Sequence, residues 1–100
     1  MAEAIAIERE DTDTKGRYVA RVDGHDELGE AEMTFTKSGP STIIIDHTGV
    51  PDTMRGRGVG EALVERGVRD AREAGVRIIP LCPFAKAMIA RRPEWQDVLK

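Results

Sequence analysis

The sequence predicts a single α+β domain, 1–100, in which antiparallel strands precede a strand–helix–strand–helix unit. Two observations support this class. In the first half, short runs rich in β-branched and aromatic residues are separated by turn signals. In the second half, the apolar residues change to the spacing of a helix and then return to that of a strand. The expected sheet is therefore mixed, and its last crossover is a right-handed βαβ unit.

Four strands are expected in the first half, at 4–8, 17–23, 27–37 and 42–50. The third alternates apolar residues such as Met33 and Phe35 with polar ones, which is typical of an antiparallel strand with one buried face. The turn signals DG at 23–24 and SGP at 38–40 separate the later strands. The fourth run, TIIIDHTGV, is the most apolar, so we expect it at the centre of the sheet.

The second half predicts two helices and one strand. A helix is expected at 59–74, with Gly75 as a typical helix-ending residue. A strand at 76–81 follows, and a second helix then begins with Pro83 at its first position and is ended by Pro93. The closing segment is expected to form a small apolar cluster of Trp95, Val98 and Leu99.

The composition argues against several classes of protein. The chain carries a net charge of −3 and only four aromatic residues, which argues against a nucleic-acid-binding surface. It has one cysteine, so no disulfide can form within the chain. The N-terminus MAEAIAIERE lacks the pattern of a signal peptide, and no apolar stretch approaches transmembrane length. We therefore expect a cytoplasmic protein with neither a membrane nor a nucleic acid as its partner.

The stretch MRGRGVG at 54–60 is a candidate phosphate-binding loop, because it joins a predicted strand to the start of a predicted helix. Backbone N–H groups at a helix N-terminus lack intrahelical partners and, together with the helix dipole, favour an anion. Gly58 and Gly60 would let the backbone approach a phosphate, and Arg55 or Arg57 would add positive charge. The spacings of a P-loop and of a dinucleotide fingerprint are both missing. The plainer alternative is a glycine-rich turn with two solvated arginines.

This stretch resembles the acetyl-CoA pyrophosphate loop of the GNAT (GCN5-related) N-acetyltransferases, Q/R-x-x-G-x-G/A between a strand and a helix. Four segments resemble a short, single-domain branch of that superfamily, in the family's order: DHTGVP at 46–51, RGRGVGEALV at 55–64, IIPLCPF at 78–84 and RRPEW at 91–95. The resemblance implies a truncated GNAT fold and acetyl-CoA as cosubstrate, with no metal. It also implies CoA contacts from the loop and its flank: Val50, Arg55, Gly56, Arg57, Gly58, Val59 and Gly60.

Acetyl transfer needs a base for the amine and an acid for the departing thiolate, and two residues are candidates. Strand alternation places His47 on the same face as Ile43 and Ile45, and a histidine near neutral pKa can take a proton. Alternation places Asp46 on the opposite face. Cys82 is expected at the N-cap of the second helix, where the dipole lowers a thiol's pKa. In the branch that the chain resembles, a matching histidine and cysteine lie near the thioester. For each residue, the alternative is a side chain that only packs in the core.

One departure from the family concerns the acceptor side. Typical GNAT domains carry one or two helices between their first two strands, whereas only residues 10–16 lie there in this chain, too few for a useful helix. An open acceptor side suits a large or protruding amine, such as a protein lysine or an N-terminus. Glu30 and Glu32 are expected to face solvent, although acidic strand residues act as bases in some GNAT enzymes.

The sequence thus predicts an acetyl-CoA-dependent N-acetyltransferase that acts on a primary amine. Two alternatives stay open. One is a noncatalytic acyl-CoA-binding regulatory module that has lost its acceptor site. The other is a small interaction domain that binds no nucleotide.

Overall fold

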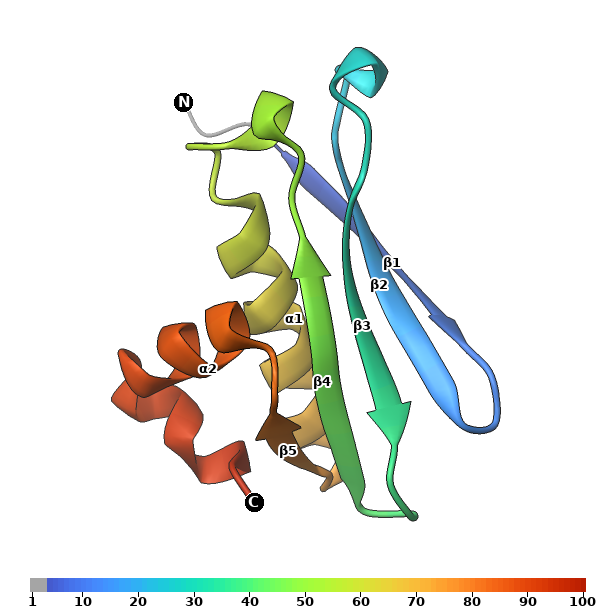
Figure 1. Ribbon diagram of the computed structural model, residues 1–100, viewed down its shortest axis with the longest axis vertical. Coiled ribbons are helices and arrows are strands. Elements are labelled where there is room, and N and C mark those ends of the chain that lie inside the picture. Colours follow the sequence, from blue (N-terminus) through green and yellow to red (C-terminus); the bar gives the residue numbers. More distant parts are fainter. Residues whose placement is uncertain (1–3) are drawn as a thin grey trace.

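The computed structural model describes residues 4–100 and shows a five-stranded sheet with α1 packed along one face (Figure 1). The strands lie in the order β1-β2-β3-β4-β5, so each strand neighbours the next one in the chain. The first four strands are antiparallel, and β5 pairs with β4 in parallel. The bounds are β1 Ile5–Asp11, β2 Lys15–Val22, β3 Ala31–Lys37, β4 Thr42–Gly49 and β5 Arg77–Pro80. This mixed α+β sheet confirms the predicted fold class.

Two α-helices follow the expected pattern. The first, α1 (Val59–Ala74), is the crossover between β4 and β5, and it ends at Gly75, whose φ of 70° is left-handed. The second, α2 (Pro83–Ala90), follows β5 and lies near the last short helix (Figure 1). The described chain also has three 3-10 helices: η1 (Asp26–Leu28), η2 (Asp52–Met54) and η3 (Pro93–Val98). No helix within residues 4–100 is long and apolar enough to cross a membrane.

The core lies between one face of the sheet and the helices α1, α2 and η3. It is a single cluster in which aromatic and aliphatic side chains of β2, β3 and β4 contact the apolar stripe of α1. Trp95 and Val98 are buried in this cluster, and Leu99 packs against it. The predicted apolar cluster at the end of the chain is therefore confirmed. We call the covered side of the sheet the helix face.

A buried tyrosine ties α1 to the first hairpin. Tyr18 is 0% exposed, and its hydroxyl donates a hydrogen bond of 2.9 Å to Asp70 Oδ2 on α1. The same hydroxyl accepts a hydrogen bond of 3.1 Å from Arg9 on β1. Burial, and then the contact with the Asp70 carboxylate, raises the pKa of Tyr18 above its usual range. These bonds fix the helix against β1 and β2.

The opposite side of the sheet, which we call the open face, carries charged side chains in place of a core. Arg17 donates to Glu10 at 2.9 Å and to Glu32 at 3.2 Å. Arg21 pairs in the same way with Glu8 and Glu30 on the two neighbouring strands. Both arginines and their partners remain well exposed. As predicted, Glu30 and Glu32 lie toward solvent.

Two expected strand boundaries are wrong. The first strand does not end at residue 8, because β1 continues to Asp11 and pairs there with Gly16. The connection shrinks to residues 12–14, a turn closed by a hydrogen bond of 2.7 Å from Thr12 N to Lys15 O. The third strand does not begin at residue 27, because η1 lies there and Gly29 at φ 88° interrupts the chain before β3. No helix separates β1 from β2.

Candidate functional site

A β-bulge in β4 decides which side chains of that strand reach the helix face. Phe35 of β3 is opposite Ile45, but the next residue back, Thr34, is opposite His47, so the register shifts by one residue. The extra residue is Asp46. Because side chains alternate between the two faces along a strand, one extra residue moves every later side chain to the face opposite the expected one. After Ile45, the next side chain of β4 on the helix face is therefore that of Thr48.

The prediction that His47 shares a face with Ile43 and Ile45 is wrong. Both isoleucines are buried, whereas His47 is exposed and lies opposite Thr34, on the open face. The prediction that Asp46 faces away from His47 is also wrong, since the Asp46 carboxylate accepts a hydrogen bond of 2.7 Å from Thr36, on the same open face. No core role remains for His47.

The chain opens a gap at the end of β4, because β5 leaves it early. The parallel pairing stops at Ile45 and Pro80. The backbone N–H groups of Leu81 and Cys82 both donate to Ile45 O at 3.1 Å, and the chain then enters α2. The last residues of β4 thus extend beyond β5. Here lies a cavity of about 520 Å³, which we call the loop cavity, lined by Thr48, Val50, Met54, Arg55, Gly56, Gly58, Val59, Gly60, Glu61, Phe84 and Met88.

The glycine loop adopts the form that an anion site requires. Gly56 and Gly58 have φ of 78° and 75°, and Gly58 is the N-cap of α1. The first helical hydrogen bond runs from Ala62 N to Gly58 O, so the preceding N–H groups of the first turn have no intrahelical partner. A Cβ on Gly58 would meet nothing within 4 Å, so the space beside this residue is open. Gly58, Val59, Gly60 and Glu61 all line the cavity, so the positive end of the α1 dipole lies at it.

Close packing against α2 explains the third glycine of the loop. A Cβ on Gly60 would lie 2.7 Å from Cζ of Phe84, whose ring borders the cavity and is 41% exposed. Glycine at this position lets the first turn of α1 approach α2. Phe84, Met88 and Val50 give the cavity an apolar wall beside its polar loop.

The charges around the loop are partly balanced by the protein itself. Arg55 is largely exposed and pairs with Asp52 at 3.0 Å. The carboxylate of Glu61 at the first turn of α1 forms an ion pair with Arg92. The Arg92 guanidinium also lies over the ring of Trp95, 4.8 Å from its centroid. Arg92 of the RRPEW segment thus neutralises Glu61, the one carboxylate among the residues that line the cavity.

Cys82 lies at the N-cap of α2, as predicted, but it does not line the loop cavity. It is 4% exposed, and its Sγ contacts Oγ1 of Thr48 at 3.5 Å. Burial pushes the pKa of Cys82 upward, but bonds from Thr48 and from the backbone of Ala85 and Phe84 outweigh this, and the pKa lies below its usual range. Thr48 therefore stands between the thiol and the cavity.

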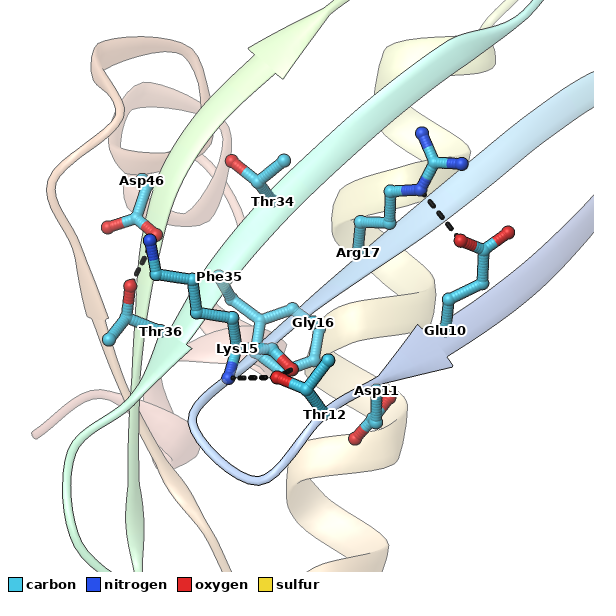
Figure 2. A pocket seen from close by; sticks show the side chains of 10 residues that line it. All are labelled: Glu10, Asp11, Thr12, Lys15, Gly16, Arg17, Thr34, Phe35, Thr36 and Asp46. Atoms are coloured by element: carbon cyan, nitrogen blue, oxygen red, sulfur yellow. Dashed lines mark hydrogen bonds and ion pairs between the residues drawn. The ribbon is translucent and has the colours of Figure 1, made fainter.

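A second cavity of about 660 Å³ lies on the open face and does not include the glycine loop. Figure 2 shows Arg17 reaching Glu10 on one side of this cavity and Thr36 reaching Asp46 on the other. Asp46, the residue before His47, is the part of β4 that lines this cavity. Its lining mixes carboxylates, hydroxyls and two cations: Glu10, Asp11, Thr12, Lys15, Gly16, Arg17, Thr34, Phe35, Thr36 and Asp46.

The structure places the expected residues in three groups. Of the seven expected CoA contacts, all but Arg57 line the loop cavity. Cys82 lies behind that cavity and His47 lies on the open face. Sequence reasoning missed Thr48, because no signal in the sequence revealed the bulge. It also missed Phe84 and Arg92, although both lie in the segments IIPLCPF and RRPEW that carried the resemblance.

Comparisons with known proteins agree with this geometry. The family profile described as GCN5-related N-acetyl-transferase matches residues 17–98. The solution NMR structure of a GCN5-like candidate N-acetyltransferase from Staphylococcus aureus is 36% identical in sequence, with a TM-score of 0.68. That similarity covers 93% of this chain and 87% of the other. Curated protein sequences gave no significant match.

Proposed function

Because the chain belongs to the GCN5-related N-acetyltransferase family, we propose that it binds acetyl-CoA in the loop cavity and transfers the acetyl group to a primary amine. One observation carries the proposal: the glycine loop and the first turn of α1, whose first N–H groups have no intrahelical partner, line a cavity that opens where β4 and β5 part. Backbone N–H groups at a helix N-terminus beside a cavity suit a pyrophosphate.

The lining of the cavity fits both parts of a CoA molecule. The loop residues Gly56, Gly58, Val59 and Gly60 would hold the pyrophosphate through their backbone, and Arg55 would offset its charge. The apolar side chains of Val50, Phe84 and Met88 would border the uncharged arm. Bound acetyl-CoA supplies an activated acyl group, and the protein's task is to orient it and to move protons.

The two candidate catalytic groups serve opposite sides of the sheet. We assign His47 to the acceptor amine, because it is exposed on the open face beside the gap where β5 leaves β4. We assign Cys82 to the departing sulfur, because it lies at the α2 N-terminus behind the loop cavity. The open face has only the turn at 12–14 between β1 and β2, so a protein lysine or N-terminus can approach it.

Calorimetry on a matched pair of glycine variants tests the CoA assignment. Gly58→Glu should abolish CoA binding, because it puts bulk and a negative charge where the pyrophosphate lies. Gly39→Glu is the control: Gly39 has φ 79° and nothing within 4 Å of a Cβ, so the backbone strain is matched, but it lies in the β3–β4 turn, at the opposite end of β4 from the loop. CoA affinity that is equal in the two folded variants would refute the phosphate-loop assignment.

A noncatalytic acyl-CoA-binding module is the second candidate function. One observation favours it: His47 and Cys82 lie on opposite sides of β4, and Cys82 is 4% exposed. Mass spectrometry of the protein with acetyl-CoA and a library of amines separates the two candidates. Acetylated amine supports the transferase, whereas CoA binding without any product supports the regulatory module.

A further inference from the structure

We propose that Thr48 is the proton donor at the reacting sulfur and that Cys82 acts through it as the proton reservoir. This inference rests on the proposed acetyl transfer and assigns a role to a residue that sequence reasoning did not single out. It starts from the bulge at Asp46, which turns Thr48 to the helix face in the position where strand alternation had placed His47.

Thr48 lies between the loop cavity and the Cys82 thiol. Thr48 lines the loop cavity, near the end of β4 where β5 has already left the strand. The Cys82 thiol donates its hydrogen to Thr48 Oγ1, with 3.5 Å between sulfur and oxygen. Because that oxygen accepts the thiol hydrogen, the hydroxyl hydrogen of Thr48 is left for another acceptor, and a sulfur bound in the loop cavity could be that acceptor. Thr48 is the only one of the two residues that a ligand in the cavity can touch.

Cys82 suits the role of a reservoir because its environment stabilises the thiolate. It occupies the N-cap of an eight-residue helix, where N–H groups lack intrahelical partners. The backbone near Phe84 and Ala85 and the hydroxyl of Thr48 all favour the charged sulfur, and together they lower its pKa despite its burial. The thiol can therefore release its proton more easily than an ordinary buried cysteine.

The proton transfers balance as follows. The amine nitrogen bonds to the acyl carbon and gives one proton to His47, and the carbon–sulfur bond breaks with its electron pair on sulfur. Thr48 gives its hydroxyl proton to that sulfur and takes the proton of Cys82, which becomes a thiolate. His47 then loses its proton to water and Cys82 regains one from water, so the protein returns to its starting state.

Two substitutions at residue 48 test the relay. Thr48→Val keeps the shape and removes the hydroxyl, so we expect turnover to fall on the order of a hundredfold while CoA affinity is kept. Thr48→Ser keeps the hydroxyl and should restore most of the turnover. Thr42→Val is the matched control, because Thr42 is a hydrogen-bonded threonine at the other end of the same strand, where its hydroxyl accepts a bond of 3.1 Å from Lys100. Turnover by Thr48→Val equal to that of the control would overturn the proposal.

A second readout does not depend on turnover. The chain has one cysteine, so the ultraviolet absorbance of the thiolate reports the titration of Cys82 alone. We expect the midpoint to move to higher pH in Thr48→Val and to stay in place in Thr48→Ser and Thr42→Val. An unmoved midpoint in Thr48→Val would overturn the coupling between the two residues.

A double variant distinguishes this inference from the proposed function. If Cys82 acts through Thr48, then Thr48→Val with Cys82→Ala should be no slower than Thr48→Val alone. If the losses of turnover in the two single variants multiply in the double variant, Thr48 and Cys82 act independently. That result would overturn the relay but leave the proposed transferase activity in place. A wild type that binds CoA but yields no acetylated amine would contradict the transferase itself, and the relay with it. In that case, the titration of Cys82 would still report the contact with Thr48.

Discussion

The helix face and the open face of the sheet are held by different kinds of interaction. On the helix face, side chains such as Tyr18 and Ile45 are fully buried and each has fixed partners. On the open face, Arg17 and Arg21 each share two carboxylates that remain exposed to water. Burial makes the first set of contacts strong and specific, whereas solvent weakens the second. The comparison suggests that the helix face fixes the fold and that the open face is available for a partner.

The end of β4 joins these two environments. Thr48 lies on the helix face at the loop cavity, and His47, the residue before it, lies on the open face. Cosubstrate and acceptor can therefore approach the same short segment from opposite sides. The following predictions test this division, beginning with the largest expected effect.

On the open face, we expect His47 to matter for catalysis. We expect His47→Ala to lower kcat on the order of a hundredfold and to leave CoA affinity unchanged. The loss should shrink at high pH, where the amine loses its proton without help. His25→Ala is the control, because it removes the chain's other histidine, near η1. Steady-state kinetics across a pH series measures the effect, and wild-type turnover by His47→Ala would remove His47 from the mechanism.

The helix face should matter for stability at its buried tyrosine. Tyr18→Phe removes two hydrogen bonds, and we expect it to lower the free energy of unfolding by about 1 kcal/mol. The pKa of Tyr18 is raised in the folded state, so its contribution is complete below a pH of about 10 and is lost as pH rises above that value. Urea unfolding at neutral and alkaline pH measures both effects.

The chain contains one tyrosine, so this alkaline loss can be assigned to it. The gap between the stabilities of wild type and Tyr18→Phe should narrow as pH rises, because only the wild type has a phenol that ionises on unfolding. A gap that stays constant from neutral to alkaline pH would contradict the burial of the hydroxyl.

The smallest effect should come from the ion pairs of the open face. Arg17→Ala removes contacts to Glu10 and Glu32, but all three side chains already reach water. We expect a melting temperature close to that of the wild type and a smaller change than in Tyr18→Phe. Thermal melts of the two variants side by side provide the check, and equal losses would mean that both faces hold the fold alike.

Much of the fold could be predicted because its signals are local. The helical spacing at 59–74, the ending glycine at 75 and the proline at 83 gave the correct positions of α1 and α2. The continuation of β1 to Asp11 could not be predicted, since charged residues carry no strand signal and the pairing partner supplies the order. The helical turn at Asp26–Leu28 was hidden for a similar reason: its residues have no apolar period.

The candidate site could be predicted where backbone chemistry defines it. The glycines of the loop follow from the turn and the close approach that they permit, and the structure has both. The sequence could not predict which face of the sheet carries His47 and which carries Thr48, because this depends on one extra residue in the pairing of β3 with β4. The contact of Thr48 with Cys82 likewise joins residues 34 positions apart. Such features require the tertiary structure.

The consecutive order of the strands also bears on how the chain folds. Three of the four strand pairs are antiparallel neighbours joined by short connections, which close with little loss of entropy and form quickly. Only the pairing of β4 with β5 must wait for the crossover through α1. We therefore expect a nascent chain to hold its first four strands before β5 and α2 dock. The loop cavity, which needs α2 for its wall, would then be completed last, so CoA could act only on the finished molecule.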